Sequence, residues 1–123
     1  MRSLLSLLLL LALEVQMQAH AQSVQLLVQS SLLAGFRYGE AAAVMPLMHK
    51  GDALELVREQ DNPHDPDAVR VEWRGRKLGY VPRRQNAALA WGLDRGTPLR
   101  ARVSRLDDHP NPARRIEFEV YIE

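Results

Sequence analysis

The sequence predicts a mostly β protein, a small and partly open barrel of five to six strands with one or two short helices. Several segments alternate apolar and polar residues with the two-residue period of a strand, most clearly residues 69–73 and 116–122. Only residues 83–95 have the Ala, Leu and Arg content of a helix. Many short strands around so little helix favour a barrel over a layered α/β sheet.

The N-terminal part of the barrel is expected to begin with residues 24–33, whose alternation suits a half-buried strand. Glycines then interrupt the pattern, so we expect Phe36, Arg37 and Tyr38 at a strand end or on a loop, with their side chains displayed. A Gly-Asp turn precedes the next strand, which begins at Leu54.

The middle of the chain is predicted to form a loop and a hairpin. Asp, Asn and Pro dominate residues 59–67 and favour turns. Residues 69–73 then place three large apolar side chains, ending with Trp73, on one face of a strand. Gly75 breaks this strand, and residues 77–81 are expected to be its hairpin partner.

The C-terminal part is predicted to contain one helix and two strands. Residues 83–95 suit a helix of about three turns. We expect Trp91 on this helix, like Trp73, to pack in the core. Residues 99–105 and 116–122 are predicted to be strands separated by a polar turn.

The size and charge of the chain restrict its function. A length of 123 residues suits one domain. Sixteen Lys and Arg against 15 Asp and Glu give a formal charge of +1, so any site for nucleic acid must be a local patch. The sequence has no cysteine, which excludes disulfides, thiolate metal sites and cysteine nucleophiles.

Residues 1–21 are predicted to be a secretory signal peptide, followed by a single domain over residues 22–123. Arg2 supplies the positive start, residues 4–13 form an apolar run too short to span a bilayer, and residues 19–21 offer an Ala-x-Ala cleavage site. We therefore expect an exported protein, periplasmic or secreted, with no integral membrane span after cleavage. An uncleaved anchor, a short helix of the folded domain and a misassigned start in a cytoplasmic protein are the alternatives.

Two motifs carry a family resemblance. Residues 54–71 read Leu-Glu-Leu-Val-Arg-Glu-Gln-Asp-Asn-Pro-His-Asp-Pro-Asp-Ala-Val-Arg-Val, and residues 77–83 read Lys-Leu-Gly-Tyr-Val-Pro-Arg. This order closely resembles the HIRAN domain family, whose members show Leu-x-Arg-Glu, an Asn-Pro-Tyr-Asp-x-x-Ala loop, a Gly-Tyr-Val-Pro turn and a helix rich in Ala and Leu. The resemblance extends over residues 33–105, most of the predicted mature chain.

The resemblance implies an OB-like barrel that binds single-stranded DNA at its 3′ end, with a pocket for the terminal nucleotide. The matching positions are Arg37, Tyr38, Asn62, His64, Asp65 and Tyr80. In such a site Asp65 accepts a hydrogen bond from the free 3′-hydroxyl, aromatic rings stack on bases, and Arg37 contacts phosphate. It implies a monomeric binding module without a cofactor and not an enzyme, because the helicase or nuclease regions often fused to HIRAN domains do not appear in this sequence.

The sequence departs from the family pattern at two positions. His64 stands where members usually carry Tyr, and Gly39 stands where many carry a second aromatic residue. Both changes reduce the surface available for base stacking, which contributes about 1–3 kcal/mol per base.

The acidic loop is also open to other interpretations. Asp61, His64, Asp65 and Asp67 are possible metal ligands, but no glycine at the turn and no closing Glu give the spacing of a calcium loop. We therefore expect Asp61 and Asp67 to cap turns and no metal to bind. Asn62 and Asp65 have the alternative of serving only to close the loop.

Catalysis is the least favoured function. Ser104, Asp108 and His109 are close in sequence, but no strand-turn-helix elbow accompanies them. Arg37, Arg70 and Arg102 would track phosphates if they shared a groove. The second hypothesis for function is an exported interaction module that binds a protein or glycan of the cell envelope, which the signal peptide and the near-neutral charge favour.

Overall fold

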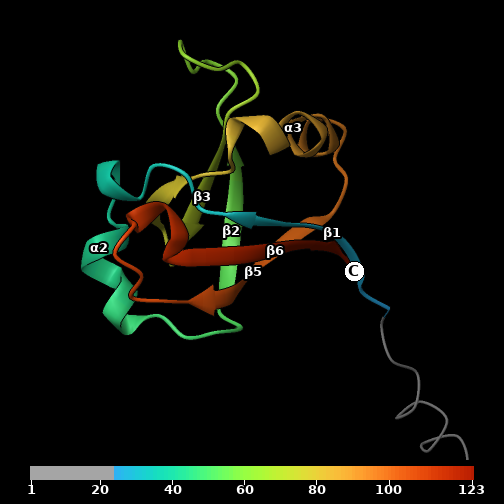
Figure 1. The fold of residues 1–123 in the computed structure, drawn as a ribbon. Coiled ribbons are helices and arrows are strands. Elements are labelled where there is room, and N and C mark those ends of the chain that lie inside the picture. The colour runs from blue at the N-terminus through green and yellow to red at the C-terminus, as the bar shows by residue number, and fades with distance from the viewer. Residues whose placement is uncertain (1–23) are drawn as a thin grey trace, which may run out of the picture.

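The computed structural model describes residues 24–123, and the predicted signal peptide at residues 1–21 lies outside the described residues (Figure 1). The strands are β1 (Leu26–Leu32), β2 (Ala53–Arg58), β3 (Val69–Trp73), β4 (Arg76–Tyr80), β5 (Leu99–Leu106) and β6 (Ile116–Ile122). The α-helices are α2 (Ala41–Val44) and α3 (Ala87–Asp94). Single 3-10 turns are η1 (Phe36–Tyr38), η2 (Met45–Leu47), η3 (Arg83–Gln85) and η4 (Pro112–Arg114).

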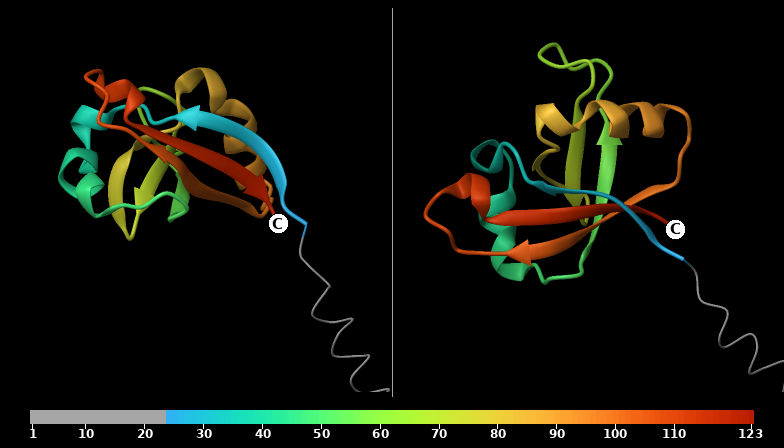
Figure 2. Two further views of the ribbon diagram at one scale, coloured as in Figure 1. Left: turned by 60° about the horizontal axis from the view of Figure 1, so that its bottom comes forward. Right: turned by 45° about the vertical axis from the view of Figure 1, so that its right-hand side comes forward.

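The six strands form one antiparallel sheet in the order β1-β6-β5-β2-β3-β4. The sheet curls so that β1, β6 and β5 cross in front of β2, β3 and β4 (Figures 1 and 2). It is not closed along its length. Ala34 after β1 pairs with Tyr80 at the end of β4 in an isolated bridge of two backbone hydrogen bonds, each of 2.9 Å. This confirms the predicted mostly β, partly open, OB-like barrel with two short helices.

The core lies inside the curled sheet and confirms the faces predicted from the alternating strands. Val71 and Trp73 of β3 and Phe118 of β6 are buried, each at most 3% exposed. The indole Nε1 of Trp73 donates to Asp52 Oδ2 at 3.1 Å, which satisfies the one polar group of this buried ring.

The predicted helix of about three turns is wrong in length. The structure has η3, then Asn86, and then the eight-residue helix α3. The Asn86 side chain is 2% exposed and its amide donates to Asp65 Oδ2 at 2.7 Å. Asn86 is therefore held by the loop before β3, and the regular helix begins only after it. Within residues 24–123 no helix is long and apolar enough to cross a membrane.

The predicted burial of Trp91 is wrong, because its side chain is 63% exposed. Leu89 takes the core-facing position of α3 and is 1% exposed. A residue two positions later is turned about 200° around the helix axis, away from the core. The ring of Trp91 instead carries the guanidinium of Arg95, 3.9 Å from its centroid.

Two expectations for the N-terminal part are also corrected. The first half of β1 is not half-buried: Leu26 and Leu27 are 61% and 60% exposed, because β1 is an edge strand paired only with β6. Phe36 is not displayed but is 5% exposed and packs in the core, whereas Tyr38 is 89% exposed. The 3-10 turn η1 separates the two aromatic rings in this way.

Candidate nucleic-acid interface

The predicted loop after β2 joins β2 to β3 and projects from the barrel at the top of Figure 1. Together with the end of β4 and the chain after β1 it surrounds a hollow of about 340 Å³, which we call the loop hollow. The residues that line it are Ala34, Asn62, His64, Asp65, Ala68, Tyr80, Val81 and Arg83. Four of the six predicted binding residues therefore share one hollow.

The side chain of Asn62 closes the loop on itself. Its Oδ1 accepts hydrogen bonds from the backbone N–H groups of His64 and Asp65, at 2.8 and 3.2 Å. Its Nδ2 donates to Glu59 Oε1 at 3.0 Å. The first pair of bonds is the Asx-turn pattern expected of Asn before Pro, so Asn62 has a structural role that any binding role would share.

Asp65 is a half-buried carboxylate with partners on both oxygens. Oδ1 accepts from the backbone N–H of Asp67 at 3.0 Å and Oδ2 from the Asn86 amide at 2.7 Å. The guanidinium Nε of Arg83 lies 3.6 Å from Oδ2. Burial works against ionisation, but these donors and the nearby Arg83 outweigh it and hold the pKa of Asp65 below its ordinary value. The hollow therefore contains a fixed negative charge beside a cation.

Glu59 organises the site, and the sequence analysis did not single it out. Its carboxylate accepts from the Tyr80 hydroxyl at 2.9 Å and from Asn62 at 3.0 Å, and it pairs with Arg70 at 2.5 Å. Burial raises its pKa, but the bonds from Arg70, Asn62 and Tyr80 outweigh this and lower the pKa overall. The sequence feature that could have identified Glu59 is its position as the last residue of the Leu-x-Arg-Glu motif.

The Tyr80 side chain makes contacts within the protein through its hydroxyl and through one face of its ring. Besides the bond to Glu59, the Lys77 ammonium lies 4.6 Å from the ring centroid. The backbone of Tyr80 forms the bridge to Ala34. Tyr80 is thus a wall of the loop hollow that the strand pairing and the Glu59 bond fix in place.

His64 and Arg83 form the exposed rim of the loop hollow. A guanidinium nitrogen of Arg83 donates to the backbone oxygen of His64. The Arg83 side chain remains 70% exposed, so it can turn to meet a ligand. Sequence analysis did not select Arg83, although it directly follows the Gly-Tyr-Val-Pro motif.

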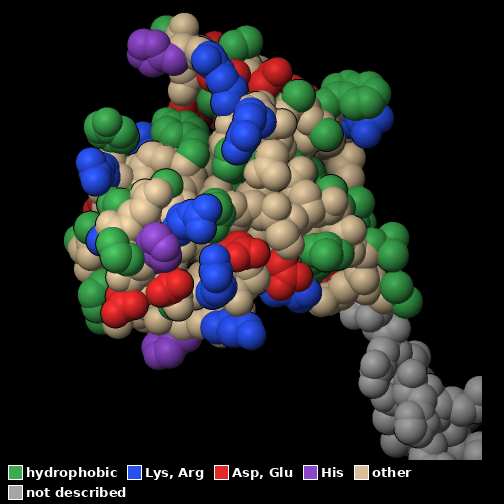
Figure 3. Space-filling view, viewed as in Figure 1, with side chains coloured by type: hydrophobic (Ala, Val, Ile, Leu, Met, Phe, Trp, Pro, Cys, Tyr) green, Lys and Arg blue, Asp and Glu red, His purple; other side chains and the backbone are tan. Residues whose placement is uncertain are grey.

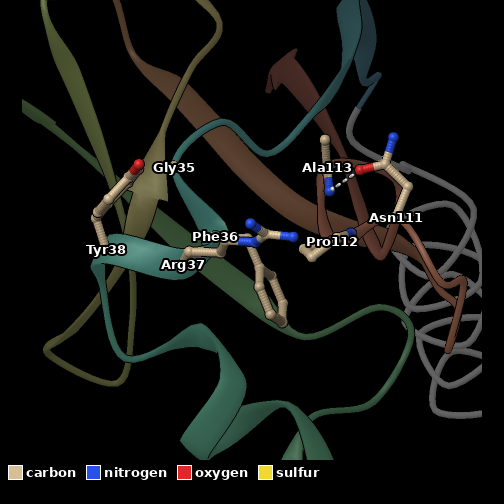
Figure 4. A pocket seen from close by; sticks show the side chains of 7 residues that line it. All are labelled: Gly35, Phe36, Arg37, Tyr38, Asn111, Pro112 and Ala113. Atoms are coloured by element: carbon tan, nitrogen blue, oxygen red, sulfur yellow. Dashed lines mark hydrogen bonds between the residues drawn. The ribbon is translucent and has the colours of Figure 1, made fainter.

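Arg37 and Tyr38 lie at a neighbouring hollow of about 330 Å³, which we call the Tyr38 hollow. The residues that line it are Gly35, Phe36, Arg37, Tyr38, Asn111, Pro112 and Ala113. The Arg37 side chain points toward Pro112 and the Tyr38 side chain points to the opposite side (Figure 4). The two hollows lie next to each other. Ala34 lines the loop hollow and Gly35 lines the Tyr38 hollow, and a Cβ added to Gly35 would lie 3.9 Å from the ring of Tyr80. The six predicted residues thus occupy two adjacent hollows.

The three arginines considered for a common groove do not share one. Arg70 is held by Glu59 and by Glu72, at 2.5 and 2.7 Å, and Arg102 lies 3.7 Å from Glu119. Neither lines a hollow with Arg37. The structure therefore does not bring the three arginines together for phosphate tracking.

Metal binding and catalysis gain no support from the geometry. Among residues 24–123 no group of three His, Asp or Glu side chains is placed to hold a metal ion. Ser104 Oγ is buried without a hydrogen-bond partner, and His109 Nδ1 accepts a bond from the backbone of Asn111.

The structure defines a small, curled β domain of OB-like architecture with open, charged hollows at its rim. The particular family is shown by sequence: the HIRAN domain model matches residues 26–123, and the chain belongs to this family.

Solved structures support the fold. A crystal structure of a protein from Lactobacillus plantarum is 28% identical, with a TM-score of 0.70 over 80% of this chain and 94% of that one. The HIRAN domain of human HLTF is 21% identical, with a TM-score of 0.60 over 79% of this chain and 77% of that one. A search of the curated proteins found no match to this chain.

Proposed function

We propose that this chain binds the 3′ end of single-stranded DNA, with the terminal nucleotide in the loop hollow. The observation that carries the proposal is that Asn62, His64, Asp65 and Tyr80, which match the family's binding positions, line one hollow together with Arg83. Membership of the HIRAN family supports binding of nucleic acid in general.

Asp65 is suited to read a free 3′-hydroxyl. A carboxylate offers about four acceptor positions, and the fold uses one on each oxygen of Asp65 for a hydrogen bond. The remaining positions can accept the hydroxyl proton. An internal nucleotide has no such proton, so the contact distinguishes an end from the middle of a strand.

The rim supplies the rest of the interaction. Arg83 beside the hollow can pair with a phosphate of the bound strand, and the exposed rings of His64 and Tyr38 can stack on bases. Because the net charge of the chain is only +1, the arginines at the rim have to provide the local attraction for phosphate.

Fluorescence anisotropy of residues 22–123 with one short DNA strand carrying three different ends tests the proposal. The ends are a free 3′-hydroxyl, a 3′-phosphate and a 2′,3′-dideoxy terminus, which lacks the hydroxyl without adding charge. We expect the free end to bind most tightly. Asp65→Asn should abolish the preference, whereas Asp67→Asn, which removes an exposed charge from the same loop, should keep it.

Equal affinity for the three ends would reject end recognition. Thermal unfolding of Asp65→Asn accompanies the assay, because this variant also loses acceptor capacity toward Asn86. A folded Asp65→Asn protein that still prefers the free hydroxyl would assign the recognition to another group.

We further propose that the protein is exported to the periplasm or the medium, on the basis of residues 1–21. The N-terminal residue of the protein purified from its native host tests this. Gln22 at the N-terminus would support cleavage, and Met1 would favour an uncleaved anchor or a cytoplasmic protein.

A second candidate function is an interaction module for a protein or glycan of the cell envelope. It is favoured by the exposed apolar side chains of Leu26, Leu27 and Val28 on the edge strand β1. A Leu26→Ser, Leu27→Ser double variant should then lose an envelope partner that Asp65→Asn keeps. If Asp65→Asn loses the partner and the double variant keeps it, the loop hollow is supported as the functional site.

A further inference from the structure

A third hollow continues the two already described. It has a volume of about 330 Å³, and we call it the Arg84 hollow. The residues that line it are Ser30, Ser31, Leu32, Pro82, Arg84, Gln85, Arg105 and Glu117. Going along the chain, residues 30–32 line the Arg84 hollow, Ala34 the loop hollow and residues 35–38 the Tyr38 hollow. The loop hollow is therefore flanked by the other two.

Contacts across the molecule hold the Arg84 hollow next to the loop hollow. The amide Nε2 of Gln29 on β1 donates to the backbone oxygen of Gln85 in η3 at 3.1 Å, which ties the two sides together. Val81 and Arg83 line the loop hollow, while Pro82 and Arg84 line the Arg84 hollow. Successive residues of one short segment thus face two adjoining sites.

The Arg84 hollow carries available positive charge. Arg84 is exposed, and within the described part of the chain no carboxylate lies within ion-pair distance of it. Arg105 lies 3.2 Å from Glu117, but its side chain is 54% exposed. Lys and Arg side chains lie below the projecting loop on this face of the molecule, with Asp and Glu side chains beside the lower ones (Figure 3). The exposed Ser30 hydroxyl and the exposed Gln85 amide add hydrogen-bond donors.

We propose that the Arg84 hollow binds the phosphodiester backbone of the nucleotides that precede the terminal one, with Arg84 as the principal contact. This inference rests on the proposed function. A strand that ends in the loop hollow has to leave it on one side. The Arg84 hollow offers two arginines and the Ser30 hydroxyl on that path, the group types that proteins use for phosphate.

The Tyr38 hollow is less suited to a charged backbone. Phe36, Pro112 and Ala113 give it an apolar wall, and Arg37 is its one cation among the residues that line it. An apolar wall suits a base better than a row of phosphates. The strand is therefore expected to leave across η3.

Salt-dependent binding of two free 3′-hydroxyl ligands of different length tests the inference. The shorter is a single nucleoside, which fills only the loop hollow, and the longer is a strand of roughly twelve nucleotides, within the size range of an OB-type site. Arg84→Ala should bind the longer strand roughly tenfold more weakly, as expected for one charge-assisted contact. The plot of log affinity against log salt has a negative slope, and Arg84→Ala should make it shallower by about 0.7, the value for one phosphate contact on a single strand. Binding of the single nucleoside, which has no phosphate to place in the Arg84 hollow, should change little.

Arg100→Ala is the matched control. Its side chain is 62% exposed and pairs with Glu123 at 3.0 Å, toward the opposite end of β5 from Arg105. It removes the same charge and should leave both lengths and the salt slope unchanged. Arg84 makes no ion pair with a described residue, so its replacement is not expected to affect folding.

Three results would overturn the inference while leaving the proposed function intact. The first is an unchanged salt slope in Arg84→Ala, and the second is an equal loss for both lengths, which would place Arg84 at the terminal nucleotide. The third is a reduced slope in Arg37→Ala with none in Arg84→Ala, which would route the strand through the Tyr38 hollow. If the unmodified protein binds neither ligand, the proposed function fails and this inference fails with it.

Discussion

The hydroxyl of Tyr80 donates a hydrogen bond to the carboxylate of Glu59, with 2.9 Å between Oη and Oε1. The same carboxylate accepts from Asn62 and Arg70, so it links the end of β4 to the loop between β2 and β3. Glu59 does not line the loop hollow itself. Glu59 therefore holds Tyr80 and Asn62, two residues that line the hollow, from outside it. One substitution, Tyr80→Phe, can remove the bond between Tyr80 and Glu59.

Removing the Tyr80 hydroxyl should destabilise the domain. Tyr80→Phe loses a bond to an ionised acceptor, but Arg70 and Asn62 continue to satisfy Glu59, so we expect the free energy of unfolding to fall by about 1 kcal/mol. Urea denaturation measures it. Tyr38→Phe is the control, because the 89% exposed Tyr38 ring should contribute nothing through its hydroxyl. Equal stability of the two variants would contradict the role given to the Tyr80 bond.

Adding a methyl group at Gly79 should open the barrel. A Cβ at this position would lie 2.2 Å from the backbone oxygen of Ala34, the partner of Tyr80 in the bridge. Because a backbone atom cannot give way locally, Gly79→Ala should lower the free energy of unfolding by more than about 1 kcal/mol and weaken the bridge. Amide hydrogen exchange of Tyr80 reports the bridge directly.

Gly75→Asn provides the control for Gly79→Ala. Gly75 has a φ of +79°, a Cβ added there would meet nothing within 4 Å, and Asn tolerates this left-handed conformation. The Gly75→Asn protein should fold with nearly normal stability. If the Tyr80 amide of Gly79→Ala exchanges its hydrogen as slowly as in the unmodified protein, the close approach of residue 79 to the Ala34 oxygen is not needed for the bridge.

The stability of the domain should fall in acid partly through Asp65. Its pKa is lowered in the folded protein and returns toward the ordinary value of 3.8 on unfolding. The stabilisation is therefore fully present above that value and is lost as the pH falls through the lower folded pKa. Urea denaturation from about pH 6 to about pH 2 should show a smaller acid loss in Asp65→Asn than in the unmodified protein.

Asp61→Asn is the comparison for this acid series, since it removes an exposed carboxylate from the same loop. It should retain the acid-dependent loss of the unmodified protein. If Asp65→Asn retains the whole loss as well, the hydrogen bonds from Asp67 and Asn86 do not stabilise the ionised form.

Restoring the family's aromatic residue at position 64 should strengthen DNA binding. The His64 side chain is exposed at the rim, and the contact made there by Arg83 is to the backbone oxygen, which a substitution leaves in place. His64→Tyr adds stacking surface, so affinity for a free 3′ end should rise by roughly 1 kcal/mol or more. Anisotropy titration measures the change, with His49→Tyr, another exposed histidine, as the control. Weaker or unchanged binding would place the terminal base away from residue 64.

The sequence by itself determined the strands, the turns and the family. The two-residue alternation at residues 69–73 and 116–122 appears as β3 and β6 with the predicted faces buried. The Asn62 turn followed from short-range bonding between Asn and its own backbone. These features depend on neighbours in sequence, so local patterns are sufficient to find them. The resemblance carried by the two motifs also predicted one site, of which four residues line the loop hollow and two line the Tyr38 hollow: Asn62, His64, Asp65 and Tyr80, and Arg37 and Tyr38.

Only the tertiary structure decided which side chains line the same hollow. It also decided which of them already make hydrogen bonds or ion pairs within the protein. The exposure of Trp91 and of Leu26 depends on what packs against α3 and β1, and a helix or strand pattern carries no information about that. Glu59 became the centre of the site because pairing β2 with β3 and β3 with β4 brings it to Tyr80, 21 residues away. Arg83 and Arg84 reach adjoining hollows because the bridge between Ala34 and Tyr80 sets the chain after β1 beside η3. Such long-range placements arise when the sheet curls, and local sequence patterns do not encode them.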